Sequence, residues 1–99
     1  MQIPLTSVQE AGSAIRALRK RARIRIDDFA ATAGVSKQFM TDLENGKPTV
    51  QMGMVLSLLQ RMGVGVRMEL PDGAQQAFRV EQEKTLARKA RKGAVSRDT

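Results

Sequence analysis

The stretch RIDDFAATAGVSKQFMTDLENGK, residues 25–47, is the most informative part of this chain for predicting its fold. It predicts two short helices that meet at Ala33-Gly34-Val35, because glycine ends a helix in a left-handed conformation without a Cβ clash. Ser36 is a good N-cap for the second helix, and Gly46 followed by Pro48 ends it. Two short helices joined by a tight turn indicate a helix-turn-helix, in which the second helix lies in a DNA major groove.

Two further helices are expected on either side of this motif. The sequence SVQE at residues 7–10 is a capping box, in which the Ser7 hydroxyl accepts from the Glu10 amide and the Glu10 carboxylate reaches back to the Ser7 amide. An apolar stripe continues this helix to about Ala22, and a similar stripe predicts a helix over about residues 49–62. We therefore expect a mainly α, four-helix DNA-binding domain over residues 1–63.

Residues 64–70, VGVRMEL, alternate apolar and polar side chains, which predicts one β-strand with a single buried face. A lone strand leaves its backbone groups unpaired, and this is costly. We expect the strand to pair with the same strand of a second subunit, while a hairpin with residues 77–80 is the alternative. The apolar residues expected at the dimer strand are Val64, Val66, Met68 and Leu70.

Residues 71–99 are rich in charge and poor in large apolar side chains. Such a composition buries too little apolar surface to hold one conformation. We therefore expect a largely flexible tail, in which residues 81–92 form at most a marginal helix. Its composition is compatible with contact to DNA, to a protein partner or to neither.

The composition also excludes several classes of function. The 99 residues contain no cysteine and no histidine, so disulfides, thiolate chemistry and the usual general acid–base residue are absent. We expect no catalytic residue, no metal site and no cofactor. No apolar run reaches the length of a membrane span, and the N-terminus lacks a signal-peptide pattern. The sequence therefore favours a soluble, cytoplasmic protein without a membrane partner.

The formal net charge of +7 favours a polyanionic partner. The positive charge is concentrated in two places, with six basic residues between Arg16 and Arg25 and seven between Arg79 and Arg97. The three aromatic residues are all phenylalanines, which argues against a single-stranded RNA module that stacks bases on aromatic rings.

A helix in the major groove presents the side chains of its first turns to base edges. Lys37 can donate to guanine O6 and N7, and Gln38 can pair its amide with adenine N6 and N7. Thr41, one turn further on, can meet a thymine methyl group or a phosphate. We therefore expect these three residues to read bases. Phe39 fits either a core position or an apolar contact with DNA.

Gly34-Val35-Ser36 followed by Leu43-Glu44-Asn45-Gly46-Lys47 resembles the "GVS…LE.GK" signature of the Xre/Cro helix-turn-helix regulators. The resemblance covers about residues 12–64 and implies a lambda-repressor-like fold. Within that family, a four-helix domain followed by a short strand is similar to the HipB-type and Y4mF-type antitoxins. The resemblance implies a homodimer that represses its own operon and binds a HipA-type kinase toxin.

The same resemblance assigns roles to matching positions. In phage repressors of this fold, an arginine of the first helix forms a salt bridge with the glutamate that ends the recognition helix, and Arg19 and Glu44 occupy those positions here. The family often opens its second helix with a phosphate-binding glutamine; this chain has Ile26 there, so Arg23 or Arg25 is expected to take over the contact. The further residues expected to meet the DNA backbone are Ser36, Asn45 and Lys47.

The sequence thus predicts a double-stranded DNA-binding transcriptional repressor that reads a palindromic operator as a homodimer. As the resemblance implies, it would be the antitoxin of a type II toxin–antitoxin operon and would regulate its own promoter. One alternative is a protein-interaction module whose main role is to neutralise a HipA-type kinase toxin. The other is a stand-alone Xre-family regulator without a toxin.

Overall fold

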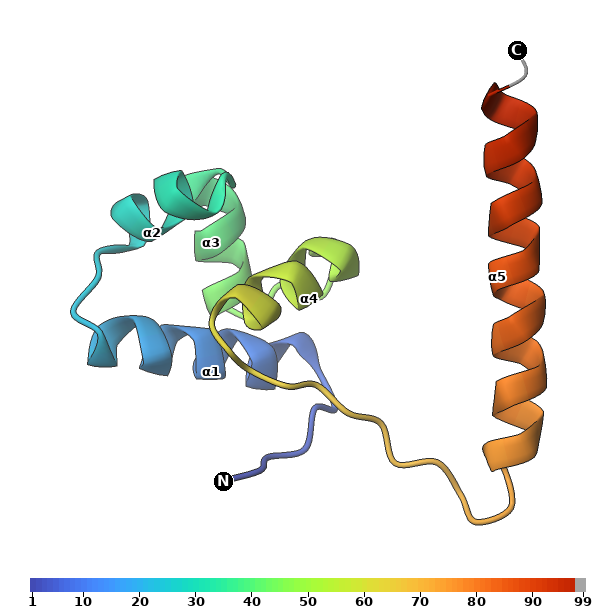
Figure 1. Cartoon of the computed structure of the whole chain (residues 1–99). Helices are drawn as coiled ribbons and strands as arrows, with labels where there is room; N and C mark the ends of the chain where they lie inside the picture. The colour runs from blue at the N-terminus through green and yellow to red at the C-terminus, as the bar shows by residue number, and fades with distance from the viewer. Residues whose placement is uncertain (98–99) are drawn as a thin grey trace. The chain divides into compact units, whose positions relative to one another are not determined.

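The computed structural model describes the backbone of residues 1–97 and the side chains of residues 1–92. The described chain contains five helices, shown in Figure 1: α1 (Val8–Arg21), α2 (Ile26–Ala33), α3 (Lys37–Glu44), α4 (Met52–Arg61) and α5 (Gln75–Arg97). One compact unit spans Met1–Val66, and a second begins at Arg67. The first unit holds α1 to α4, which confirms the predicted four-helix domain.

α1 begins at the predicted N-cap, but the cap is not the predicted capping box. The Ser7 hydroxyl accepts from the amide of Gln9 at 3.2 Å rather than from that of Glu10. The Glu10 carboxylate accepts from the hydroxyls of Ser7 and Thr6 and, at 3.3 Å, from the amide of Thr6. The hydrogen bonds from Ser7 and then Thr6 lower the pKa of Glu10 to about 2. The return bond to the Ser7 amide is therefore a wrong prediction, because the carboxylate reaches one residue further back.

The helix-turn-helix is present as predicted. α2 ends at Gly34, which has a left-handed φ of +73°. A residue with a Cβ is strained at this φ, so Gly34 fixes the point at which the chain leaves α2. Ser36 then caps α3 by accepting from the amide of Phe39 at 2.9 Å.

The core lies where the four helices of the first unit meet, and α3 contacts both α1 and α2. Every one of these helices contributes buried apolar side chains. The buried residues of the core are Ala11, Ile15, Ala30, Met40, Leu43, Val55, Leu58 and Leu59. Because Met40 and Leu43 hold one side of α3 against this core, its other side is left at the surface.

Gly12 allows α1 and α3 to cross closely. A Cβ added to Gly12 would overlap the carbonyl oxygen of Leu43 and crowd the backbone of Glu44. Backbone atoms of a packed helix cannot move aside as the end of a flexible side chain can. No pattern around Gly12 in the sequence points to this role, because the atoms it meets belong to another helix.

The β-strand predicted for residues 64–70 is not seen, and residues 1–97 contain no strand. The amide of Val64 donates to the carbonyl of Leu59 at 2.9 Å, after which the chain runs on without regular structure (Figure 1). The hairpin alternative is wrong, since residues 77–80 belong to α5. A strand forms only beside a partner's backbone groups, and the groups of residues 77–80 are used within a helix.

α5 occupies most of the region for which the sequence predicts a flexible tail. The helix extends beyond residues 81–92 in both directions. The side chains of residues 75–92 are all exposed. The last two residues of the predicted tail lie outside the described chain. Among the described helices, none is both long and apolar enough to cross a membrane.

Candidate nucleic-acid interface

α3 is held to the core on one side and open on the other. Its buried residues are Met40, Leu43 and Glu44. Lys37 and Gln38 are exposed and Thr41 is half-buried. Ser36, the N-cap of α3, is exposed as well. The residues predicted to read bases therefore lie outside the buried side of α3, in its first turns.

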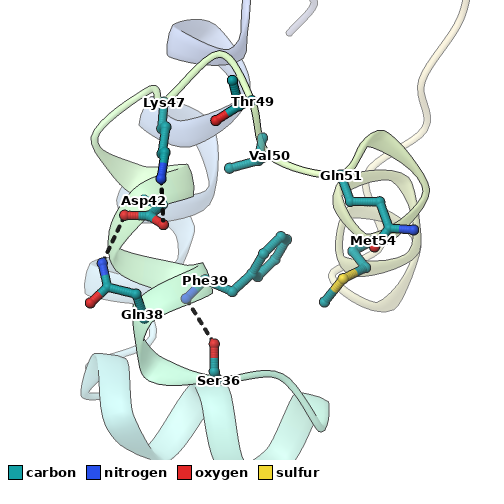
Figure 2. A pocket seen from close by; sticks show the side chains of 9 residues that line it. All are labelled: Ser36, Gln38, Phe39, Asp42, Lys47, Thr49, Val50, Gln51 and Met54. Atoms are coloured by element: carbon teal, nitrogen blue, oxygen red, sulfur yellow. Dashed lines mark hydrogen bonds and ion pairs between the residues drawn. The ribbon is translucent and has the colours of Figure 1, made fainter.

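A chain of polar contacts joins α3 to the loop that follows it. The side-chain nitrogen of Gln38 donates to one carboxylate oxygen of Asp42 at 2.8 Å, and the Lys47 ammonium lies 3.5 Å from the other oxygen. Figure 2 shows the Asp42 carboxylate between these two side chains. The structure thus connects two of the predicted DNA contacts through Asp42, an acid that is not among the residues predicted to contact DNA.

A surface hollow lies beside these contacts, between α3 and the start of α4. The ring of Phe39 points toward Val50 and Met54 in this hollow (Figure 2). Phe39 is half-buried and packs against the core, which supports its core role. The other residues that line the hollow are Ser36, Gln38, Asp42, Lys47, Thr49 and Gln51.

The Glu44 carboxylate anchors the end of α3 to α1. Its side chain is 1% exposed and accepts from Arg19 at 2.7 and 2.8 Å and from Arg16 at 3.2 Å. Burial alone would raise the pKa of Glu44, but the hydrogen bonds from Arg19 and then Arg16 outweigh it and lower the pKa. The salt bridge expected between Arg19 and Glu44 is therefore present. Arg19 also donates to the carbonyl of Ile24 at 2.8 Å, which ties the chain before α2 to the same anchor.

Arg16 is a second partner of Glu44, which the sequence did not predict. It also donates to the side-chain oxygen of Asn45 at 3.0 Å. Arg16 and Arg19 are three residues apart, so both lie on one face of α1. This spacing could have indicated Arg16 as a second partner of Glu44. On charge alone, Arg16 reads as one more residue of a solvated polar face.

The remaining residues predicted to contact the DNA backbone lie at different places in the unit. Asn45 follows α3, with its side-chain oxygen bound to Arg16. Arg25 precedes α2 and pairs with the exposed carboxylate of Asp27 at 3.4 Å. Arg23 has a left-handed φ of +59°, a conformation that costs a residue with a side chain about 1–2 kcal/mol. Arg23 and Arg25 thus belong to the connection between α1 and α2, and not to the hollow beside α3.

Residues 10–70 match the model of a protein family described as a helix-turn-helix domain. The chain belongs to this family. Helix-turn-helix proteins bind DNA through their second helix, so this family member is a DNA-binding transcription regulator. It is 42% identical over 62 residues to the uncharacterized HTH-type transcriptional regulator y4mF of Sinorhizobium fredii (strain NBRC 101917 / NGR234). The match covers 63% of this chain and 82% of that relative.

Solved structures share the fold of this regulator. A chain of the HipB-O4 20mer complex has a TM-score of 0.57 at 17% identity, over 73% of this chain and 99% of its own length. A chain of the HipA-HipB-O2-O3 complex likewise has a TM-score of 0.57 at 17% identity, over 73% and 99%. Over 73% of its length, this helix-turn-helix regulator therefore has a fold similar to that of the matched chains in the two HipB complexes.

Proposed function

We propose that this regulator is a dimeric repressor whose two α3 helices read a palindromic operator in double-stranded DNA. The observation that carries the proposal is the division of α3 into a side anchored through Glu44 and a side that leaves Lys37 and Gln38 exposed. An anchored helix presents its side chains at defined positions, which the recognition of base edges requires. In a symmetric dimer the two α3 helices would lie about 34–36 Å apart, one turn of DNA.

The proposed contacts have two different tasks. Lys37 donates to a guanine, Gln38 pairs with an adenine, and Thr41 contacts a thymine methyl group. Contacts to phosphates set the register of the protein on the duplex and carry no sequence information themselves. The residues proposed for phosphate contacts are Arg23, Arg25, Ser36, Asn45 and Lys47.

A matched pair of alanine variants separates the two tasks. Gln38→Ala should weaken binding to the preferred operator by about 1–3 kcal/mol and reduce the base preference at one position, because a bidentate base contact is lost. Lys47→Ala should weaken binding to all sequences alike. It should also reduce the slope of the logarithm of the binding constant against the logarithm of the salt concentration by about one. Fluorescence anisotropy at several salt concentrations measures both effects on oligonucleotides selected by the wild-type protein. Exchanged outcomes for the two variants would overturn the assignment.

Residues 64–70 are the proposed dimer seam. Val66, Met68 and Leu70 are exposed at 41, 77 and 46%, so three large apolar side chains alternate along an unpaired stretch of chain. Pairing with the same segment of a second copy would satisfy the backbone groups and bury one apolar face. Val64 contributes less, since it already packs in part against the core.

The repressor is further proposed to be the antitoxin of a type II toxin–antitoxin operon and to regulate the promoter of that operon. Support comes from the shared HipB fold and from the presence of HipA in one of the similar complexes. One alternative is a module that mainly neutralises a HipA-type kinase toxin, with the exposed α5 as its contact. The other is a stand-alone regulator without a toxin.

Co-expression with the products of neighbouring genes, followed by affinity purification, distinguishes these roles. A kinase retained by the full chain and lost on truncation after Val80 supports toxin neutralisation through α5. Promoter binding without any retained kinase indicates a stand-alone regulator.

A further inference from the structure

The Asp42 carboxylate lies on a surface proposed to meet phosphates, where an acid would be repelled. Its side chain is 25% exposed. One oxygen accepts from the side-chain nitrogen of Gln38 at 2.8 Å, and the other lies 3.5 Å from the Lys47 ammonium. Both partners are proposed DNA contacts. Asp42 therefore acts on a base-reading residue and a phosphate-binding residue at once.

We propose that Asp42 is a positioning residue that sets the base preference of Gln38; this rests on the proposed function of α3 as the reading helix. The two ends of a glutamine amide have nearly the same shape, but one end donates and the other accepts. Turning the amide over would place its oxygen against the Asp42 carboxylate, so that two acceptors would face each other. Asp42 therefore holds the nitrogen of Gln38 toward itself and fixes the orientation of the amide.

The fixed amide favours adenine over guanine. One N–H of the Gln38 amide is engaged with Asp42, which leaves one N–H and the oxygen for the base. In the major groove adenine presents one acceptor, N7, and one donor, the N6 amino group, and these match the remaining groups. Guanine presents two acceptors, N7 and O6, so the Gln38 oxygen would face an acceptor. Without Asp42, the amide is free to turn both N–H groups toward guanine.

Lys47 makes the acid compatible with DNA. Its ammonium offsets the charge of the second Asp42 oxygen, and its backbone amide donates to the Asp42 carbonyl at 2.9 Å, which holds the loop against α3. The Lys47 side chain is 55% exposed, so it can reach a phosphate while it stays near Asp42. The acid is thus neutralised locally and does not add repulsion to the interface.

The test compares Asp42→Ala and Asp42→Asn with Asp28→Ala, which removes the same charge from an exposed position of α2. The probes are double-stranded oligonucleotides that the wild-type protein selects from a random pool. Two probes are made, with adenine or guanine at the position where Gln38→Ala reduces the base preference. The measured quantity is the ratio of the affinities for the adenine and guanine probes. Thermal unfolding of each variant verifies that it is folded.

Asp42→Ala should lower this ratio about tenfold, within the range that one bidentate contact supplies. Asp28→Ala should leave the ratio unchanged, because the acid that accepts from the Gln38 amide is Asp42. Asp42→Asn keeps a side-chain oxygen that can accept from Gln38 and should restore most of the ratio. Asp28→Ala removes one negative charge, as Asp42→Ala does, and therefore controls for the change in net charge.

An unchanged ratio in Asp42→Ala, with Gln38→Ala still relaxing the base pair, overturns the role of Asp42 and leaves the proposed function intact. An equal fall in Asp28→Ala, or no rescue by Asp42→Asn, attributes the effect to charge alone and also overturns it. A wild-type protein that selects no sequence overturns both the proposed function and this inference.

Discussion

Replacement of Glu44 by alanine is expected to lower the free energy of unfolding by about 3–5 kcal/mol, the range for breaking a buried ion pair. The Glu44 side chain is 1% exposed, and its main partner Arg19 is 11% exposed. Removal of the carboxylate leaves the Arg19 guanidinium without its partner in a largely buried position. It also removes the bond from Arg16 to Glu44 and leaves Arg16 only its bond to Asn45. The carboxyl end of α3 would therefore lose most of the contacts that hold it to α1.

Thermal and denaturant unfolding of Glu44→Ala beside Asp42→Ala measures this effect. Asp42 is a matched control because it lies on the same helix and pairs with Lys47, whose side chain is 55% exposed. Solvent-exposed pairs contribute about 0–1 kcal/mol. Equal losses of stability in the two variants would contradict an anchoring role for Glu44.

The same anchor makes stability depend on pH. Burial raises the pKa of Glu44, but the hydrogen bonds from Arg19 and Arg16 lower it by more than burial raises it. The pKa of Glu44 in the folded state therefore lies below its pKa in the unfolded state. The contribution of the ion pairs is then fully present above the unfolded pKa and is lost as pH falls through the folded pKa. Glu44→Gln has no carboxylate to protonate. The difference in stability between Glu44→Gln and the wild type should therefore shrink below about pH 4.3. A difference that stays constant in acid would contradict the ion pairs of Glu44 as the source of this pH dependence.

Replacement of Met68 by glutamate is expected to produce monomers and to weaken operator binding about 10²–10⁴-fold, the gain that linking two binding modules supplies. Met68 lies in the proposed seam and is 77% exposed in the single chain. In the proposed dimer a glutamate at this position would place two like charges, one from each copy, in a buried face. Each monomer would then read only half of the palindrome.

Analytical ultracentrifugation and operator titration of Met68→Glu measure the two effects. Gln60→Glu is the matched control, since it adds the same charge at an exposed position of α4, outside the seam. A Met68→Glu protein that remains fully dimeric would show that residues 64–70 do not form the dimer interface. Normal operator binding by a monomeric variant would contradict the need for two linked α3 helices.

The helices of the first unit could be predicted because their signals are local. Gly34 ends α2, Ser36 caps α3, and the apolar spacing of each helix is set within a few residues. The Arg19–Glu44 pair was accessible through a resemblance, because the family places a salt bridge there. The strand at residues 64–70 was not seen, because alternation shows only that one face can be buried and does not supply the partner strand.

The beginning and end of each helix of the helix-turn-helix follow from neighbouring residues, since helical hydrogen bonds join residues four apart and caps act within one turn. How α3 is held, and which side chains its outer side exposes, depend on contacts between helices. The closeness of Gly12 to Leu43 and the second bond to Glu44 from Arg16 both arise between helices that are distant in the sequence. Such contacts depend on how helices cross, and packing of complete side chains fixes that crossing.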